Sequence, residues 1–169
     1  MKISRSVLLI SLLACTAAAG AQQTVQPTRP AAAPQAPQQQ KLTPAQQAQV
    51  TRQDAEMSKA AARVVQLVDT GKTAEVWDGA SRVAKAVVTR EAFVSQISAD
   101  RKKLGAAGER KRVAVTRSAY AAGGQVPAGN YINVVYATRF ANSPQPVREL
   151  VSFHLDEDKT WRVSGYSLR

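Results

Sequence analysis

The sequence predicts an α+β fold in which helices cover one face of a curved, four-stranded antiparallel sheet. Apolar residues recur every three to four positions in the first part of the chain, as in amphipathic helices. From about residue 113 onward they alternate with polar residues, as in strands. The connections between the expected strands are short turns, which favour an antiparallel meander over parallel strands with crossover helices.

Three helices are expected before the sheet. In the first, Thr43 is a suitable N-cap, Pro44 fits the first helical position, and Gly71 ends the helix. The third follows a Thr89 cap and stops at Gly105. The apolar faces of the three helices consist of Val50, Met57, Ala61, Val64, Val65 and Val68; of Val76, Trp77, Ala80, Val83, Ala84 and Val87; and of Phe93, Ile97 and Leu104.

Four strands are expected after the helices. The first contains Val113 and Val115, the second covers residues 131–140, and the third alternates apolar and polar residues over 151–156. The fourth covers residues 161–168, where Gly165 interrupts the alternation and is well placed for a β-bulge.

The first 21 residues have the pattern of an export signal. Lys2 and Arg5 form a positive end, residues 7–14 are largely apolar, and residues 19–21 give the small-x-small pattern that predicts cleavage after Ala21. Residues 12–15 also resemble a bacterial lipobox, in which Cys15 would be lipidated. The export signal predicts a periplasmic protein, and the lipobox predicts an outer-membrane lipoprotein. Lipidation of Cys15 is the only attachment to a membrane that we expect.

Residues 22–43 are rich in glutamine, proline and alanine and contain few large apolar side chains, which predicts a disordered linker. Residues 44–169 are then expected to form a single α+β domain, a usual size for one domain. No apolar run reaches the roughly 20 residues that a membrane-spanning helix needs.

Composition excludes several classes of site. One cysteine cannot form a disulfide framework, and one cysteine with one histidine cannot form a closed zinc site. The acidic turn at residues 156–158 is too tight to wrap a calcium ion. We therefore expect no metal and no cofactor.

The chain carries 23 basic and 12 acidic residues, and the basic residues are dense between positions 101 and 112. Cations in the last turn of a helix suit the helix dipole, which explains half of this segment. The alternative is a docking surface for an anionic envelope component or protein. Nucleic acid is disfavoured, because no aromatic residue is interleaved with the basic ones. The candidate surface consists of Arg101, Lys102, Lys103, Arg110, Lys111 and Arg112.

Ser152, His154 and Asp156 contain the three side-chain types of a hydrolase triad. Residues two apart on a strand stand about 6.6–7 Å apart, whereas a nucleophile and its base must reach hydrogen-bonding distance. Their face is expected to be solvent-exposed, because it lies opposite Val151 and Phe153. No catalytic residue is therefore assigned, and a non-enzymatic protein is expected.

Large aromatic residues are expected mainly in the core. Some could instead line a small-ligand pocket on the concave face of the sheet, near the two tryptophans. The candidates are Trp77, Tyr131, Trp161 and Tyr166.

From about residue 64 to 169 the chain resembles a bacterial family, the domain of unknown function 4019. The resemblance rests most on the terminal Trp161–Tyr166 run, Trp-Arg-Val-Ser-Gly-Tyr, while Phe93 stands where the family pattern has tryptophan. It implies an exported or lipid-anchored domain and no catalytic residue. The size and element order also resemble the cone-shaped roll of nuclear-transport-factor-like and cystatin-like proteins. The other residues that carry the resemblance are Asp69-Thr70-Gly71, Trp77, Arg101, Leu104-Gly105, Gly129-Asn130-Tyr131, Phe140-Ala141-Asn142 and Glu149.

Together these features predict an exported envelope protein with a non-enzymatic binding or accessory domain. A small-ligand pocket, with or without catalysis, and a binder of anionic surfaces or nucleic acid are the alternatives.

Overall fold

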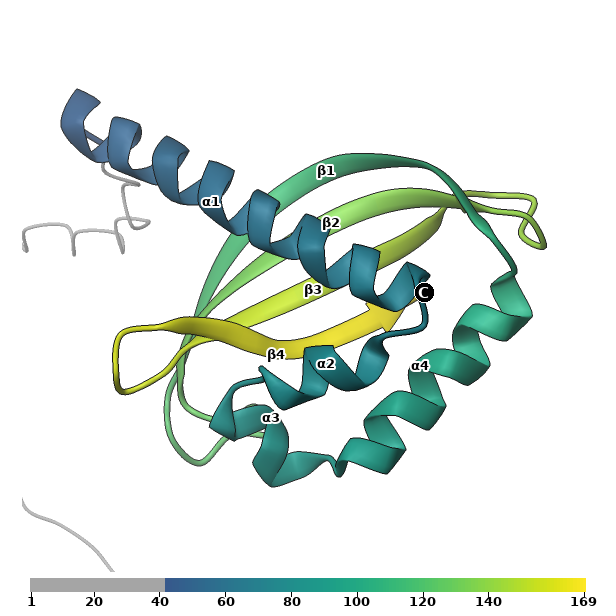
Figure 1. Ribbon diagram of the computed structural model, residues 1–169. Helices are drawn as coiled ribbons and strands as arrows, with labels where there is room; N and C mark the ends of the chain where they lie inside the picture. The colour runs from purple at the N-terminus through teal and green to yellow at the C-terminus, as the bar shows by residue number, and fades with distance from the viewer. Residues whose placement is uncertain (1–41) are drawn as a thin grey trace, which may run out of the picture. The chain divides into compact units, whose positions relative to one another are not determined.

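The helices of this protein precede its sheet in the chain, as a computed structural model of residues 42–169 shows (Figure 1). The predicted signal peptide, the cleavage site after Ala21, Cys15 and residues 22–41 of the predicted linker lie outside the described residues. Between residues 42 and 169, no helix is both long enough and apolar enough to cross a membrane. The elements are α1 (Pro44–Asp69), α2 (Thr73–Asp78), α3 (Arg82–Val87), α4 (Arg90–Leu104), β1 (Ala107–Tyr120), β2 (Gly129–Phe140), β3 (Val147–Leu155) and β4 (Trp161–Leu168).

Helix α1 begins and ends where the sequence predicts. The Thr43 side chain accepts from the backbone amide of Gln46, and the Gln46 side chain accepts from the Thr43 amide, which makes a capping box. Gly71 follows the helix with φ of 75°, the left-handed conformation that favours glycine. The helix lies across the sheet and buries Met57, Val65 and other residues of its apolar stripe against it (Figure 1).

The single helix predicted over the Val76–Val87 stripe is wrong, because this segment forms two short helices. Ser81 lies between α2 and α3, and its side chain caps α3 by accepting from the amide of Val83. The Ser81 amide donates to the carbonyl of Val163 on β4, at 2.8 Å. This tertiary hydrogen bond takes the chain out of the helix and fixes α3 beside the edge of the sheet.

The four strands form one antiparallel sheet in the order β1-β2-β3-β4. The pairing of β3 with β4 shifts between Val163 and Gly165, so the bulge predicted at Gly165 is confirmed. Strand β1 begins six residues before Val113, and the basic residues 110–112 therefore belong to a strand. The predicted arrangement, helices on a curved antiparallel sheet, is confirmed.

The two faces of the sheet differ in what covers them. On the helix face, Ile132, Val134, Val151 and Phe153 are buried and pack with the apolar stripe of α1. The side chains that alternate with them point to the opposite side, which we call the open face. Its central residues include Asn133, Val135, Leu150 and Ser152.

Candidate functional site

The basic segment is divided between two elements and two roles. Arg101 on α4 pairs with Asp69 at 2.8 Å and lies over the ring of Phe140, 4.7 Å from its centroid. Arg110 on β1 also pairs with Asp69, at 3.0 Å. Both arginines are partly buried and engaged within the domain, so the six residues do not form one continuous docking surface. Of the other four, Lys102 and Lys103 are exposed on α4, Lys111 pairs with Glu109, and Arg112 donates to Ser58.

Arg110 leads to a buried carboxylate that joins all four strands. Glu149 on β3 is fully buried and accepts from Arg110 on β1 at 2.6 Å, from Thr138 on β2 at 2.6 Å, and from Tyr166 on β4. Burial raises the pKa of the Tyr166 hydroxyl, and the charge of Glu149 raises it further. Burial would lower the pKa of Arg110, but the hydrogen bonds and charges of its two acidic partners outweigh this and raise it.

This network explains much of the family resemblance in structural terms. Asp69, Arg101, Phe140, Glu149 and Tyr166, which carry the resemblance, all belong to it or pack on it. These residues connect α1, α4 and the sheet. Their role is therefore to hold the fold together, and Tyr166 is part of this network instead of a pocket.

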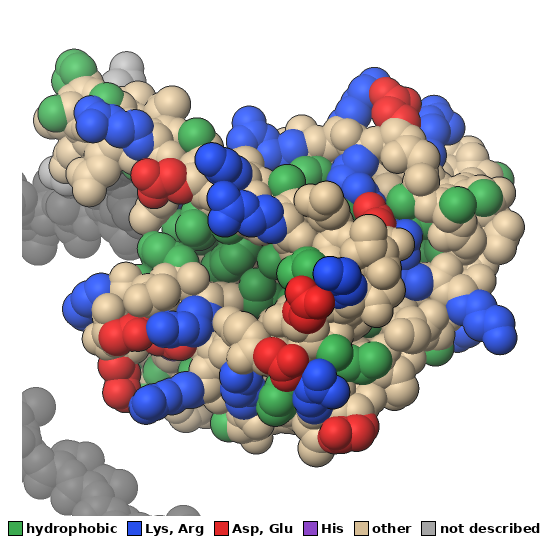
Figure 2. Space-filling model, in the orientation of Figure 1, with side chains coloured by type: hydrophobic (Ala, Val, Ile, Leu, Met, Phe, Trp, Pro, Cys, Tyr) green, Lys and Arg blue, Asp and Glu red, His purple; other side chains and the backbone are tan. Residues whose placement is uncertain are grey.

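Of the other candidate aromatic residues, Trp77 packs within the domain, whereas Tyr131 and Trp161 border a cavity. The Trp77 indole donates to the carbonyl of Val88 at 3.4 Å, and Lys85 lies over its ring. Trp161 and Ile132 line a cavity of about 440 Å³ on the helix face. Tyr131 also borders this cavity, but its ring packs edge-on against Tyr120 and His154. Figure 2 shows hydrophobic side chains in a recess between α1 and the turn that joins β3 to β4. A pocket next to one of the two tryptophans is therefore present, whereas Trp77 is not among its lining residues.

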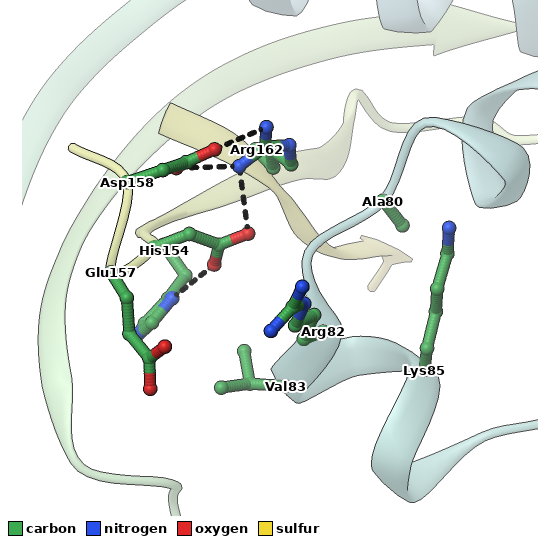
Figure 3. A pocket seen from close by; sticks show the side chains of 9 residues that line it. Ala80, Arg82, Val83, Lys85, His154, Glu157, Asp158 and Arg162 are labelled. Carbon is green, nitrogen blue, oxygen red and sulfur yellow. Dashed lines mark hydrogen bonds and ion pairs between the residues drawn. The ribbon is translucent and has the colours of Figure 1, made fainter. Parts of the chain in front are cut away.

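His154 and Asp156 are buried, so the expectation that they face solvent is wrong. The Nδ1 atom of His154 lies 2.8 Å from Asp156 Oδ1, and the buried Ser81 hydroxyl donates to the same carboxylate (Figure 3 shows the histidine and the carboxylate). The spacing argument fails for this pair because β3 ends at Leu155 and Asp156 turns back toward the sheet. Ser152 takes no part in the cluster, and the serine that does comes from the α2–α3 junction.

The hydrogen bonds of this cluster connect the α2–α3 junction and the β1–β2 loop to the end of β3, and the Ser81 hydroxyl lies 3.4 Å from Nδ1 of His154. Here the Ser81 hydroxyl has no exposed surface and is directed to Asp156, while Nε2 of His154 faces the carbonyl of Ala128 at 3.3 Å. Among residues 42–169, no group of acidic, histidine and cysteine side chains could hold a metal ion.

Arg162 completes the cluster and closes the β3–β4 turn. It donates to Asp156 at 3.1 Å and to both carboxylate oxygens of Asp158, at 2.8 and 2.7 Å (Figure 3). The hydrogen bonds from Arg162 lower the pKa of Asp158. A cavity of about 400 Å³ lies beside these residues, between the turn and α3. Its acidic side chains at positions 156 and 158 are already paired with Arg162.

A third and larger hollow, of about 530 Å³, lies on the open face of the sheet. We call it the open-face hollow. Val83 and Val87 of α3 form one side of it, and Val126 and Pro127 of the β1–β2 loop contribute to another. Its floor contains both polar and apolar residues, namely Asn133, Leu150, Ser152 and Ser164.

The charge and exposure of the open-face hollow distinguish it from the other two. Arg148 and Arg169 line it, and none of its lining residues is acidic. Neither arginine belongs to any ion pair in the described part of the chain. Five large hydrophobic side chains are exposed within residues 42–169, and Val87, Tyr120 and Val126 of this set line the hollow. It is the place where unpaired positive charge and exposed apolar surface meet.

The buried cluster positions both sides of this hollow. Ser81, at the start of α3, and Ala128, at the end of the β1–β2 loop, are both hydrogen-bonded within the cluster. The Tyr131 hydroxyl adds a hydrogen bond of 2.8 Å to the carbonyl of Pro127. No local sequence signal marks the hollow, because its lining comes from α3, the β1–β2 loop and all four strands.

The fold and these contacts define the molecule as an α+β domain with a helix-covered antiparallel sheet and a ligand-sized hollow on the uncovered face. A family model described as "Protein of unknown function (DUF4019)" matches residues 60–166. The chain therefore belongs to this family, which confirms the resemblance inferred from its motifs. No curated protein matches the chain.

Proposed function

We propose that this protein is an exported bacterial envelope protein and that its domain binds an anionic partner without catalysing a reaction. One observation carries the proposal: the open-face hollow combines exposed apolar side chains with two unpaired arginines and no acidic lining residue. At about 530 Å³ its volume is within the usual range of ligand sites. The export pattern of residues 1–21 supports the envelope location, either periplasmic or, through Cys15, at the outer membrane.

We also infer that the domain does not catalyse a reaction. The one Ser-His-Asp grouping among residues 42–169 is buried and uses its hydrogen-bonding groups to hold α3 and the β1–β2 loop. An accessory role, in which the domain recruits or holds another envelope component, fits a hollow whose chemistry is charge and apolar contact.

Photo-crosslinking in the native envelope tests the proposal. A photoreactive amino acid is placed at Val126, on the rim of the hollow, and in a matched variant at Val113, a more exposed valine on edge strand β1 outside the hollow. We expect a discrete adduct from position 126 and none from position 113. The same adducts from both positions, or none from position 126, would show that the hollow does not bind a partner.

A second candidate function rests on the cavity on the helix face. It is lined by Trp161, Ile132 and Leu155, and fits a small apolar ligand. In a Trp77→Phe variant, Trp161 is the remaining tryptophan, and quenching of its fluorescence by N-phenyl-1-naphthylamine reports on binding of this apolar probe within energy-transfer range of Trp161. Saturable quenching would support the second function, and fluorescence that the probe leaves unchanged would remove it.

A further inference from the structure

The two arginines of the open-face hollow are placed side by side with the same charge. The amide of Arg148 donates to the main-chain oxygen of Arg169 at 2.7 Å, and the Arg169 amide donates back at 2.9 Å. Residues directly opposite on antiparallel strands have Cβ atoms about 4.5–5.5 Å apart, and like charges there are destabilising. An α-carboxylate at Arg169 would offset one of these charges and leave the other. The pair is therefore suited to an external anion.

A planar anion suits this pair best. Guanidinium groups bind carboxylates through two parallel hydrogen bonds, and two neighbouring guanidiniums can hold one carboxylate between them. Both arginine side chains are exposed, so a ligand carboxylate would reach them without any rearrangement of the fold.

The floor next to the arginines offers hydrogen bonds in a row across the strands. Asn133 pairs with Ser152 in the sheet, and Ser152 in turn pairs with Gly165. An amide side chain and a serine hydroxyl in such a row match the N–H and C=O groups of a peptide backbone.

The spacing of these features fits a few residues of extended peptide. Ser152 and Arg148 lie four residues apart on β3, which is about 13 Å along a strand. Leu150 lies between them on the same face. The valines of α3 and of the β1–β2 loop are positioned to contact aliphatic side chains of such a peptide.

We propose that the open-face hollow binds the free carboxyl-terminal end of a partner polypeptide. The terminal carboxylate lies between Arg148 and Arg169, the last peptide groups lie over Asn133 and Ser152, and aliphatic side chains contact Val87 and Val126. This inference rests on the proposed binding function and names the class of ligand for the same hollow. An acyl chain with an anionic head would use the arginines and the valines but would leave the polar row without partners.

Peptide binding to the purified full-length protein tests the inference. The probe is a fluorescein-labelled peptide of sequence GSALAV with a free carboxyl terminus, and its comparison is the same peptide as a carboxamide. We expect the carboxamide to bind at least about 10-fold more weakly, a difference of about 1.4 kcal/mol. Equal anisotropy curves for the two peptides would overturn carboxyl-terminal recognition.

Two variants with the same charge change localise the site. Arg148→Glu should weaken binding of the free-carboxyl peptide at least 10-fold, whereas Lys102→Glu, exposed on α4 and outside the hollow, should change it less than twofold. Equal losses in both variants would mean a general charge effect and would overturn the site. Melting curves of both variants confirm that each is folded.

The outcome is distinguishable from failure of the proposed function. A discrete envelope adduct at position 126 with no binding of the free-carboxyl peptide would keep the binding function and overturn carboxyl-terminal recognition. Tight, Arg148-dependent peptide binding without any envelope adduct would support the recognition chemistry and count against a partner in the envelope.

Discussion

Glu149 is the fully buried carboxylate that links the four strands of the sheet. It is completely buried, and its hydrogen bonds join β3 to the other three strands. Removing one partner of a buried ion pair leaves the other charge uncompensated, which is far more costly than losing an exposed pair.

We therefore expect Glu149→Gln to lower the free energy of unfolding by about 3–5 kcal/mol. Glu109→Gln is the matched control, since Glu109 pairs with Lys111 on the surface, and its loss should cost less than about 1 kcal/mol. Urea unfolding at neutral pH measures both. Similar values for the two variants would contradict a central role for the buried carboxylate.

Gly129, at the start of β2, has no room for a side chain. Its φ is 138°, and a Cβ atom there would lie 2.3 Å from Nε2 of His154. Gly123 also has a positive φ, of 89°, but nothing lies within 4 Å of its Cβ position. An alanine would be strained at either position, and of the two only the alanine at position 129 would also clash with a neighbour.

Both alanine variants should be destabilised by the backbone strain, by about 1–3 kcal/mol. Gly129→Ala should lose about 1–3 kcal/mol more, because the histidine has to move out of its hydrogen bonds. Thermal unfolding of the pair measures the difference. Equal melting temperatures would mean that His154 moves freely and does not fix the loop.

At the scale of elements, the β3–β4 turn should make the protein sensitive to acid. Burial would raise the pKa of Asp156, but hydrogen bonds from Ser81, His154 and Arg162 outweigh this and lower it. Because the pKa of Asp156 is lower in the folded protein than in the unfolded chain, the carboxylate stabilises the fold at every pH above the unfolded pKa of about 3.9. This stabilisation is lost as the pH falls from there through the lower pKa of the folded protein.

Asp156→Asn should therefore reduce stability at pH 7 and flatten the decline below about pH 4, relative to the unchanged protein. Glu157→Gln, an exposed neighbour in the same turn, is the control and should keep the original profile. Urea midpoints between pH 7 and pH 2.5 provide the measurement. An unchanged acid limb in Asp156→Asn would show that the acid sensitivity arises elsewhere.

At the scale of the whole molecule, residues 41–169 should fold by themselves. Their elements form one compact unit, and the core cluster extends from Met57 to Val163. A fragment that begins at Lys41 should melt within a few degrees of the full-length protein, because the described core needs no residue before it. A fragment that fails to fold, or that melts far lower, would show that the first 40 residues contribute to stability.

The elements themselves could be predicted well, because their signals are local. The Thr43 cap, the Gly71 and Gly105 stops and the Gly165 bulge each act on neighbouring residues. The break within the second predicted helix could not be predicted, because its cause is a hydrogen bond from Ser81 to the distant Val163.

The candidate site could be predicted only in part, because its contacts also join residues that are distant in the chain. The basic residues were recognisable, but their partners were not: Arg110 and Glu149 are 39 residues apart in the chain. Their pairing depends on the strand register, since a shift of one residue turns every side chain to the opposite face. Strand β1 contains such an irregularity between Arg112 and Ala114.

The sequence by itself determined the fold class, the order of helices and strands and the family, because periodicity, caps and turns act over a few residues. The tertiary structure alone decided which charges are buried, which remain free, and where a hollow opens. Ser81 and His154, 73 residues apart, meet beside a loop and a helix that no local signal brings together. Burial and charge pairing are properties of neighbours in space, and the folded sheet determines those neighbours.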